Sequence, residues 1–188
     1  MAIELNLPTS LTLLRIALIP LLTIVFYLPW QYSNLACTII FIIAGFTDWL
    51  DGYLARKMKL ETAFGAFLDP VADKLMVAFV LVLIVQAQAD ISVAIASAII
   101  IGREITIASL REWMAEIGQR ASVKVSDLGK WKTTTQMLAI AFLLYRDDLM
   151  GLPINLMGYW LLYLAAVLTL WSMMNYLSAA FMVMKEKQ

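Results

Sequence analysis

Four aspartates stand close together in an otherwise apolar part of the sequence: Asp48, Asp51, Asp69 and Asp73. A carboxylate at the centre of a membrane helix costs about 2.5–3.5 kcal/mol on insertion scales, so such residues usually mark a functional site. The chain has no histidine, which excludes imidazole metal ligands and histidine acid–base chemistry. Carboxylate oxygens suit hard divalent cations. The sequence therefore predicts a metal site built from carboxylates.

Both aspartate pairs are spaced to share a helix face. At about 100° per residue, Asp48, Asp51 and Ala55 fall within about 60° of one another. Small residues on such a face let a ligand or another backbone come close. Asp69 and Asp73 are four residues apart and also share a face. Since only the turn near residues 56–65 separates the two helices, we expect both pairs to converge on one cavity.

Four converging carboxylates need compensating positive charge. Arg56 and Lys74 supply part of it, and two divalent cations would supply more. Two-metal sites hold their ions about 3.5–4 Å apart and stabilise the entering and leaving oxygens of a phosphoryl displacement. The alternative is a set of ion pairs within the membrane that binds no ligand. Four acids with two adjacent bases would then leave buried charge unpaired, which is unfavourable.

The composition places these residues in a membrane. Hydrophobic residues make up 62% of the 188-residue chain and the mean hydropathy is +0.82, far above an ordinary globular domain. We expect a single all-α, polytopic membrane catalytic domain over residues 1–188, with six transmembrane helices. No charged n-region or cleavage site precedes the first apolar run, so we expect a retained helix rather than a signal peptide. The six apolar runs lie near residues 9–29, 34–55, 66–88, 91–110, 128–146 and 154–183.

Basic residues predict the orientation of these spans. With the amino terminus in the cytoplasm, the turns near 29–34, 87–91 and 146–153 lie outside and hold only Arg146. The aspartates would then face the cytoplasm. The basic residues of the inner turns and the carboxyl tail are Arg56, Lys57, Lys59, Arg111, Arg120, Lys124, Lys130, Lys132, Lys185 and Lys187.

The spacing Asp-x2-Asp-Gly-x2-Ala-Arg-x8-Gly-x3-Asp-x3-Asp resembles the signature of the CDP-alcohol phosphotransferase family at every fixed position. Members of that family are six-span membrane enzymes, generally dimeric, that displace CMP from a CDP-linked substrate with an alcohol. The resemblance implies that the four aspartates ligate two Mg2+ or Mn2+ ions, with Asp73 also the general base. It further implies a CDP-binding site formed by Thr12, Asp51, Gly52, Ala55, Arg56 and Gly65.

Further segments resemble the subgroup of the family that transfers a phosphatidyl group from CDP-diacylglycerol to glycerol 3-phosphate. They are Asn6-Leu7-Pro8-Thr9 with Thr12 and Arg15, Gly102-Arg103-Glu104-Ile105, the run 110–116, Val123-Lys124-Val125-Ser126 and the run 129–133. The acceptor is a small dianion, so the resemblance implies fixed positive charge beside the aspartates. The candidates for binding the acceptor phosphate are Arg103, Arg111, Lys124, Lys130 and Lys132.

Simpler interpretations stand beside these functional ones. Each of the five bases can be a topology or headgroup residue, Arg103 can pair with Glu104, and Arg15 can snorkel to the interface. Lone Cys37 is expected to be a core or lipid-facing residue. The resemblance implies a homodimer in a bacterial inner membrane among membrane lipids, and no nucleic-acid partner is expected.

Two other functions remain open from the sequence. The acceptor could be inositol phosphate, serine or phosphatidylglycerol instead. A cation transporter would also use intramembrane carboxylates, but near the midplane and on several spans. The aspartates lie instead at predicted helix ends, beside the glycines and Arg56.

Overall fold

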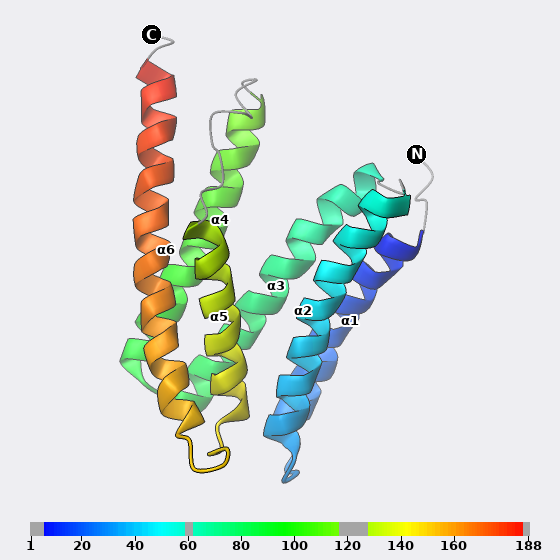
Figure 1. The fold of residues 1–188 in the computed structure, drawn as a ribbon, viewed down its shortest axis with the longest axis vertical. Coiled ribbons are helices and arrows are strands. Elements are labelled where there is room, and N and C mark those ends of the chain that lie inside the picture. The colour runs from blue at the N-terminus through cyan, green and yellow to red at the C-terminus, as the bar shows by residue number, and fades with distance from the viewer. Residues whose placement is uncertain (1–5, 59–61, 117–127, 186–188) are drawn as a thin grey trace. The chain divides into compact units, whose positions relative to one another are not determined.

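Six helices make up the part of the chain that the computed structural model describes, which is residues 6–58, 62–116 and 128–185, with side chains described outside 128–132 and 179–185 (Figure 1). They are α1 (Leu7–Tyr27), α2 (Ser33–Met58), α3 (Ala63–Gln88), α4 (Ile91–Glu116), α5 (Leu128–Tyr145) and α6 (Ile154–Lys185). Each helix coincides with one of the six predicted runs. The largest difference is at the end of α4, which continues to Glu116 rather than ending near residue 110.

Four of the six helices have the length and composition of membrane spans in the part of the chain that the structure describes. Within the described residues, α1, α2, α4 and the segment Ile154–Ser178 of α6 are each long and apolar enough to cross a bilayer. The segment Thr133–Tyr145 of α5 is a shorter apolar helix. The prediction of an all-α, polytopic membrane protein is confirmed.

The chain divides into two compact units, which we describe separately. The first contains residues up to 87 together with 141–155, and the second contains 88–140 together with 156–188. The prediction of one catalytic domain over residues 1–188 stays a prediction.

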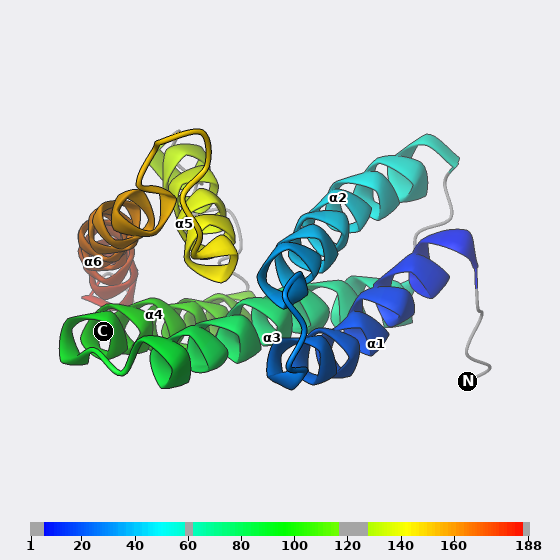
Figure 2. The ribbon, with the colours of Figure 1, turned by 90° about the horizontal axis from the view of Figure 1, so that it is seen from below.

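In the first unit, α1, α2 and α3 lie side by side (Figures 1 and 2). One face of α1 is buried at Thr9, Thr12, Arg15, Ile19 and Leu22, which recur every three or four residues as a packed helix face requires. Three of these five side chains are polar or charged, which is unusual for a helix in an apolar chain. The face of α1 at its amino-terminal half is therefore built for polar contacts.

Capping side chains define the helix ends beside this polar face. Asn6 accepts a hydrogen bond from the backbone N–H of Thr9 at 3.0 Å, and Pro8 stands in the first turn, where a missing N–H costs nothing. The Thr62 hydroxyl oxygen accepts a hydrogen bond from the N–H of Gly65 at 3.0 Å at the start of α3.

Cys37 of the first unit is buried, and its thiol lies 3.7 Å from the Leu22 carbonyl oxygen. The expectation that Cys37 is a core residue is confirmed.

In the second unit, α4 and α6 run parallel and contact each other through polar side chains. Arg103 of α4 donates to Ser172 of α6 at 3.2 Å, and Arg111 donates to Tyr176 at 3.3 Å. Asp90 caps α4 by accepting hydrogen bonds from Ser92, and these bonds hold the pKa of the exposed Asp90 carboxyl below its usual range. The two arginines therefore sit on a face of α4 that is held against α6.

Candidate functional site

Three of the four aspartates converge in the first unit. Asp48 and Asp51 lie near the end of α2, and Asp69 lies near the start of α3. One carboxylate oxygen from each can be chosen so that all three lie within 4.8 Å of one another. Asp51 is buried, whereas the side chains of Asp48 and Asp69 are 42% and 41% exposed. The cluster is therefore anchored in the protein on one side and open on the other.

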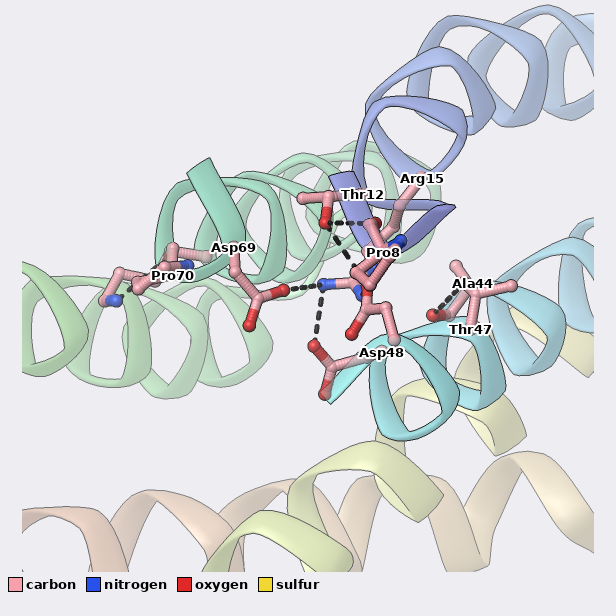
Figure 3. A network of polar contacts seen from close by, with 10 residues as sticks. Pro8, Thr12, Arg15, Ala44, Thr47, Asp48, Asp69 and Pro70 are labelled. Carbon is pink, nitrogen blue, oxygen red and sulfur yellow. Dashed lines mark hydrogen bonds and ion pairs between the residues drawn. The ribbon is translucent and has the colours of Figure 1, made fainter. Parts of the chain in front are cut away.

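Arg15 of α1 lies in the middle of this cluster (Figure 3). Its Nη1 donates to Asp48 Oδ1 at 2.7 Å and to Asp69 Oδ1 at 3.3 Å, and its Nη2 donates to Asp51 Oδ2 at 2.5 Å. The Arg15 side chain is only 1% exposed. The interpretation of Arg15 as a snorkelling residue is therefore wrong, because its guanidinium is buried among carboxylates instead of reaching the interface.

Sequence reasoning assigned the countercharge to other residues. The guanidinium of Arg56 lies beside Gly52, and Nζ of Lys74 donates to the Pro70 carbonyl at 3.0 Å. The spacing of Arg15 from Thr12 places both residues on one face of α1, since residues three apart share a helix face, but it does not specify the partners of Arg15. Thr12 also reaches the cluster, donating from its hydroxyl to Asp51 Oδ2 at 3.3 Å.

The cluster keeps unused capacity for a cation. Three carboxylates against one guanidinium leave a formal charge of −2. Asp51 Oδ1 is buried without a hydrogen-bond partner in the described structure, and so is Nε of Arg15. Buried acceptors are normally satisfied, so an unpaired carboxylate oxygen is an unused acceptor that a ligand could occupy. The donors of the cluster are all carboxylate oxygens, which fits the ligand preference of Mg2+ and Mn2+.

A pocket of about 220 Å3 adjoins the carboxylates. Asp51 and Asp69 are part of its wall, so the pocket and the cluster form one continuous site within the first unit. All six residues predicted to bind the CDP group line this pocket. Its complete lining is Pro8, Thr9, Thr12, Asp51, Gly52, Ala55, Arg56, Thr62, Gly65, Ala66 and Asp69.

Gly65 is packed too closely against its neighbours for a side chain to fit without a shift. A Cβ atom at this position would lie 3.0 Å from the Thr62 hydroxyl oxygen and 3.3 Å from that of Thr9, which is tighter than ordinary van der Waals contact. A Cβ at Gly52 would lie 3.6 Å from the nearest guanidinium nitrogen of Arg56, which is ordinary contact. Of these two glycines, Gly65 is thus the one at which close packing itself demands a missing side chain.

Asp73 lies outside the cluster of three. It follows Asp69 by one helical turn on α3, with Pro70 between them, and its side chain is exposed. The structure therefore brings together the three predicted metal ligands Asp48, Asp51 and Asp69. The fourth predicted ligand, Asp73, lies outside this group, one helical turn beyond Asp69 on α3.

The predicted acceptor bases that the structure describes belong to the second unit. Arg103 pairs with Glu104 at 2.8 Å, as the simpler interpretation had it. The guanidinium carbons of Arg103 and Arg111 lie 6.0 and 5.5 Å from the centre of the Tyr176 ring, within cation–π range. Arg103 and Arg111 thus converge on one aromatic side chain. Lys124 and the side chains of Lys130 and Lys132 lie outside the described residues.

Comparison with known proteins identifies the family. The model of the CDP-alcohol phosphatidyltransferase family matches residues 5–171, and the chain belongs to this family. Among the similar proteins is the CDP-diacylglycerol–glycerol-3-phosphate 3-phosphatidyltransferase of Haemophilus influenzae, 55% identical over 93% of both chains. Proteins of the same name from Yersinia enterocolitica and Sodalis glossinidius are 54% and 53% identical and cover 95% and 94% of this chain and 96% of their own. The family predicted from the aspartate spacing is confirmed.

Proposed function

We propose that this protein transfers the phosphatidyl group of CDP-diacylglycerol to glycerol 3-phosphate, which yields phosphatidylglycerophosphate and CMP. The observation that carries the proposal is the convergence of Asp48, Asp51 and Asp69 beside a pocket with Gly52, Arg56 and Gly65 in its wall. Relatives that are more than half identical over nearly the whole chain bear the name of this enzyme.

Asp48, Asp51 and Asp69, joined by Asp73, would hold two Mg2+ or Mn2+ ions. When bound, such ions neutralise the charge on the pyrophosphate and on the departing CMP. The all-oxygen donor set and the unpaired Asp51 Oδ1 support this assignment. Chelation should remove activity, and Mg2+ or Mn2+ should restore it better than Zn2+, because no imidazole or thiolate ligand stands in the cluster.

The pocket beside the cluster would bind the CDP group. Arg56 offers a guanidinium fork that can pair with a phosphate or a base edge. Gly52 has no side chain and Ala55 has only a methyl group, so the ligand can approach the backbone of α2. Gly65 lets the ligand approach the backbone at the start of α3. Thr12 presents a hydroxyl at the boundary between the pocket and Asp51. These residues would orient the β-phosphorus toward the open side of the carboxylates.

Asp73 would act as the general base. It would take the proton from the primary hydroxyl of glycerol 3-phosphate while that oxygen attacks the β-phosphorus of CDP-diacylglycerol. The new oxygen–phosphorus bond forms as the bond to CMP breaks, and CMP carries away the electron pair. An exposed carboxylate one turn from Asp69 can meet an acceptor that arrives from solvent.

The acceptor phosphate would bind to basic residues outside the cluster, namely Arg103, Arg111, Lys124, Lys130 and Lys132. Arg103 and Arg111 both lie against Tyr176, and Glu104 neutralises one of these two charges. A positive charge remains for an anion. Two adjacent guanidinium groups suit a phosphate dianion better than a neutral acceptor such as serine.

We further propose a multi-pass protein of the bacterial inner membrane, with the active site facing the cytoplasm and two chains forming a homodimer. The basic residues are concentrated in the turns that the sequence predicts to lie in the cytoplasm, which supports this orientation. The dimer rests on resemblance to the family.

The decisive experiment measures CMP release from CDP-diacylglycerol by the purified protein with Mg2+ present. Glycerol 3-phosphate should release one CMP per phosphatidyl group transferred, whereas inositol phosphate, serine and phosphatidylglycerol should release little. Release that is fastest with one of these other acceptors would contradict the proposed substrate. An Asp69→Asn variant with near-normal turnover would contradict the metal assignment.

A further inference from the structure

We propose that Arg15 is an internal counter-cation of the carboxylate cluster. It holds Asp48, Asp51 and Asp69 together when no metal ion is present, and it competes with divalent cations for their oxygens. This inference rests on the proposed metal site. It assigns a positioning role to a residue outside the aspartate signature.

The first step is geometric. Arg15 extends from α1, whereas its partners lie on two other helices, Asp48 and Asp51 on α2 and Asp69 on α3. Its Nη1 bridges Asp48 of α2 and Asp69 of α3 (Figure 3), and its Nη2 donates to the buried Asp51. A planar guanidinium with several fixed donors can make such a three-way bridge, and a lysine ammonium on a flexible stem cannot reproduce it. Arg15 thus fastens three helices at one point.

The second step concerns charge. Without a cation, three carboxylates whose oxygens lie within 4.8 Å of one another would repel, and one of them is buried. The guanidinium removes much of that repulsion, because each terminal nitrogen carries a share of the positive charge toward an oxygen. We therefore expect the metal-free protein to depend on Arg15 for the geometry of the cluster.

The third step is competition. The carboxylate oxygens that accept from Arg15 are also candidate metal ligands, and a divalent cation placed among them would face the guanidinium at a few ångströms. Like charges at such separations repel strongly at the dielectric of a protein. Asp51 Oδ1 and Arg15 Nε are buried without partners, so the guanidinium does not use all of the bonding capacity of the cluster. Asp51 Oδ1 would therefore be available to a divalent cation, which would compete with Arg15 for the other oxygens.

A purely structural ion pair makes a different prediction. Its loss would lower the melting temperature equally with and without metal, and it would leave the intrinsic metal affinity unchanged. Loss of a counter-cation would change the melting temperature and the metal affinity in opposite directions. The melting temperature without metal would fall, and the metal affinity would rise. Metal then stabilises the variant more than the wild type, because a ligand of the native state stabilises according to its concentration relative to Kd.

The test uses the full-length protein in detergent, with Mn2+ as the probe. Melting temperature is measured with chelator and with Mn2+, and Mn2+ affinity is measured by titration, for Arg15→Met, Arg15→Lys and a control, Lys57→Met. Lys57 is an exposed cation at the end of α2 whose ammonium lies over the Tyr53 ring. Arg15→Met should melt lower in chelator, bind Mn2+ about tenfold or more tightly, and gain more from Mn2+ than the wild type gains. Arg15→Lys should lie between the wild type and Arg15→Met in both melting temperature and Mn2+ affinity. Lys57→Met should match the wild type in both.

The outcomes separate this inference from the proposed function. Arg15→Met that folds only when Mn2+ is present supports the counter-cation. Unchanged or weaker Mn2+ affinity in Arg15→Met contradicts it, and so does an equal loss of melting temperature in both conditions. If Arg15→Met does not fold at all, Arg15→Lys decides by the same two measurements. A wild type whose Mn2+ binding is absent or insensitive to Asp51→Asn contradicts the metal site itself.

Discussion

The two units of this protein hold clusters of charged side chains with opposite net charge. In the first unit, α1 to α3 gather three carboxylates around one guanidinium and leave an excess of negative charge. In the second unit, α4 and α6 gather two guanidinium groups around one aromatic ring, with one carboxylate from Glu104, and leave an excess of positive charge. One region thus suits cations and the other suits anions.

The difference lies in how completely each charge is satisfied. Arg15 uses both terminal nitrogens on carboxylates and is almost fully buried. Arg111 instead donates to the Tyr176 hydroxyl and lies against the face of its ring, and its side chain is exposed. A cation held by a neutral partner keeps its charge available for an anion. The internally paired Arg15 therefore serves the fold and the cluster, whereas the loosely held Arg111 can serve a substrate.

The largest effect should come from the buried acid of the first region. Asp51→Asn removes one negative charge from the cluster while keeping the shape of the side chain, and the remaining carboxylates then pair more fully with Arg15. Phosphatidyl transfer should fall by at least about 10²–10³-fold, the scale of losing a charge-stabilising group at a reacting centre. CMP release and Mn2+ titration on the same preparation test this. Full activity together with weakened Mn2+ binding would mean that metal bound at the cluster does not take part in phosphatidyl transfer.

A smaller loss is expected at the exposed acid of the same region. Asp73→Asn should lower kcat by about 10²-fold, the usual scale for general-base catalysis, because the acceptor hydroxyl would lose its proton acceptor. CDP-diacylglycerol should still bind, since Asp73 lies outside the cluster that adjoins the pocket. Titrating CDP with Mg2+ present checks this. If Asp73→Asn loses CDP binding as fully as Asp51→Asn does, Asp73 acts as a metal ligand and another group is the base.

The basic region should respond in KM and not in kcat. Arg111→Ala should raise the KM for glycerol 3-phosphate about tenfold, because a hydrogen bond to a charged group is worth roughly 1.5–3 kcal/mol. The KM for CDP-diacylglycerol should change little. Tyr176→Phe is the matched control, since it removes the hydroxyl bonded to Arg111 and keeps the ring. Equal changes in both KM values would mean that Arg111 serves topology or lipid contact.

The contrast between the two regions also shows what the sequence could reveal. The six helices were predictable because apolar runs of membrane length are a strong signal, and the aspartate cluster was predictable because its spacing places carboxylates on shared helix faces. Both inferences depend on residues close together in sequence. The pocket-lining glycines and Arg56 belong to the same short segment and were found with it.

Arg15 could not be assigned in the same way. Its partners lie more than thirty residues away, on helices whose packing against α1 no periodicity specifies. The side chain of a basic residue in a membrane helix ordinarily extends toward the interface, so the local sequence favoured a different interpretation of Arg15. The contact of Arg103 and Arg111 with the ring of Tyr176 could not be predicted for the same reason, since it depends on how α4 and α6 pair.

The smallest effect should come from the pocket wall that adjoins the acidic region. Gly65→Ala places a methyl group 3.0 Å from the Thr62 hydroxyl oxygen and 3.3 Å from that of Thr9, so these side chains must shift by a few tenths of an ångström. Both threonines line the pocket, so we expect a several-fold rise in the KM for CDP-diacylglycerol, with the KM for glycerol 3-phosphate and the Mn2+ affinity nearly unchanged. Gly102→Ala is the matched control, because a Cβ there meets nothing within 4 Å and alanine favours a helix over glycine. Steady-state kinetics with each substrate varied in turn measure the change. A Gly65→Ala enzyme indistinguishable from Gly102→Ala would mean that the nucleotide does not use this wall, and that the acidic region alone recognises the CDP-linked substrate.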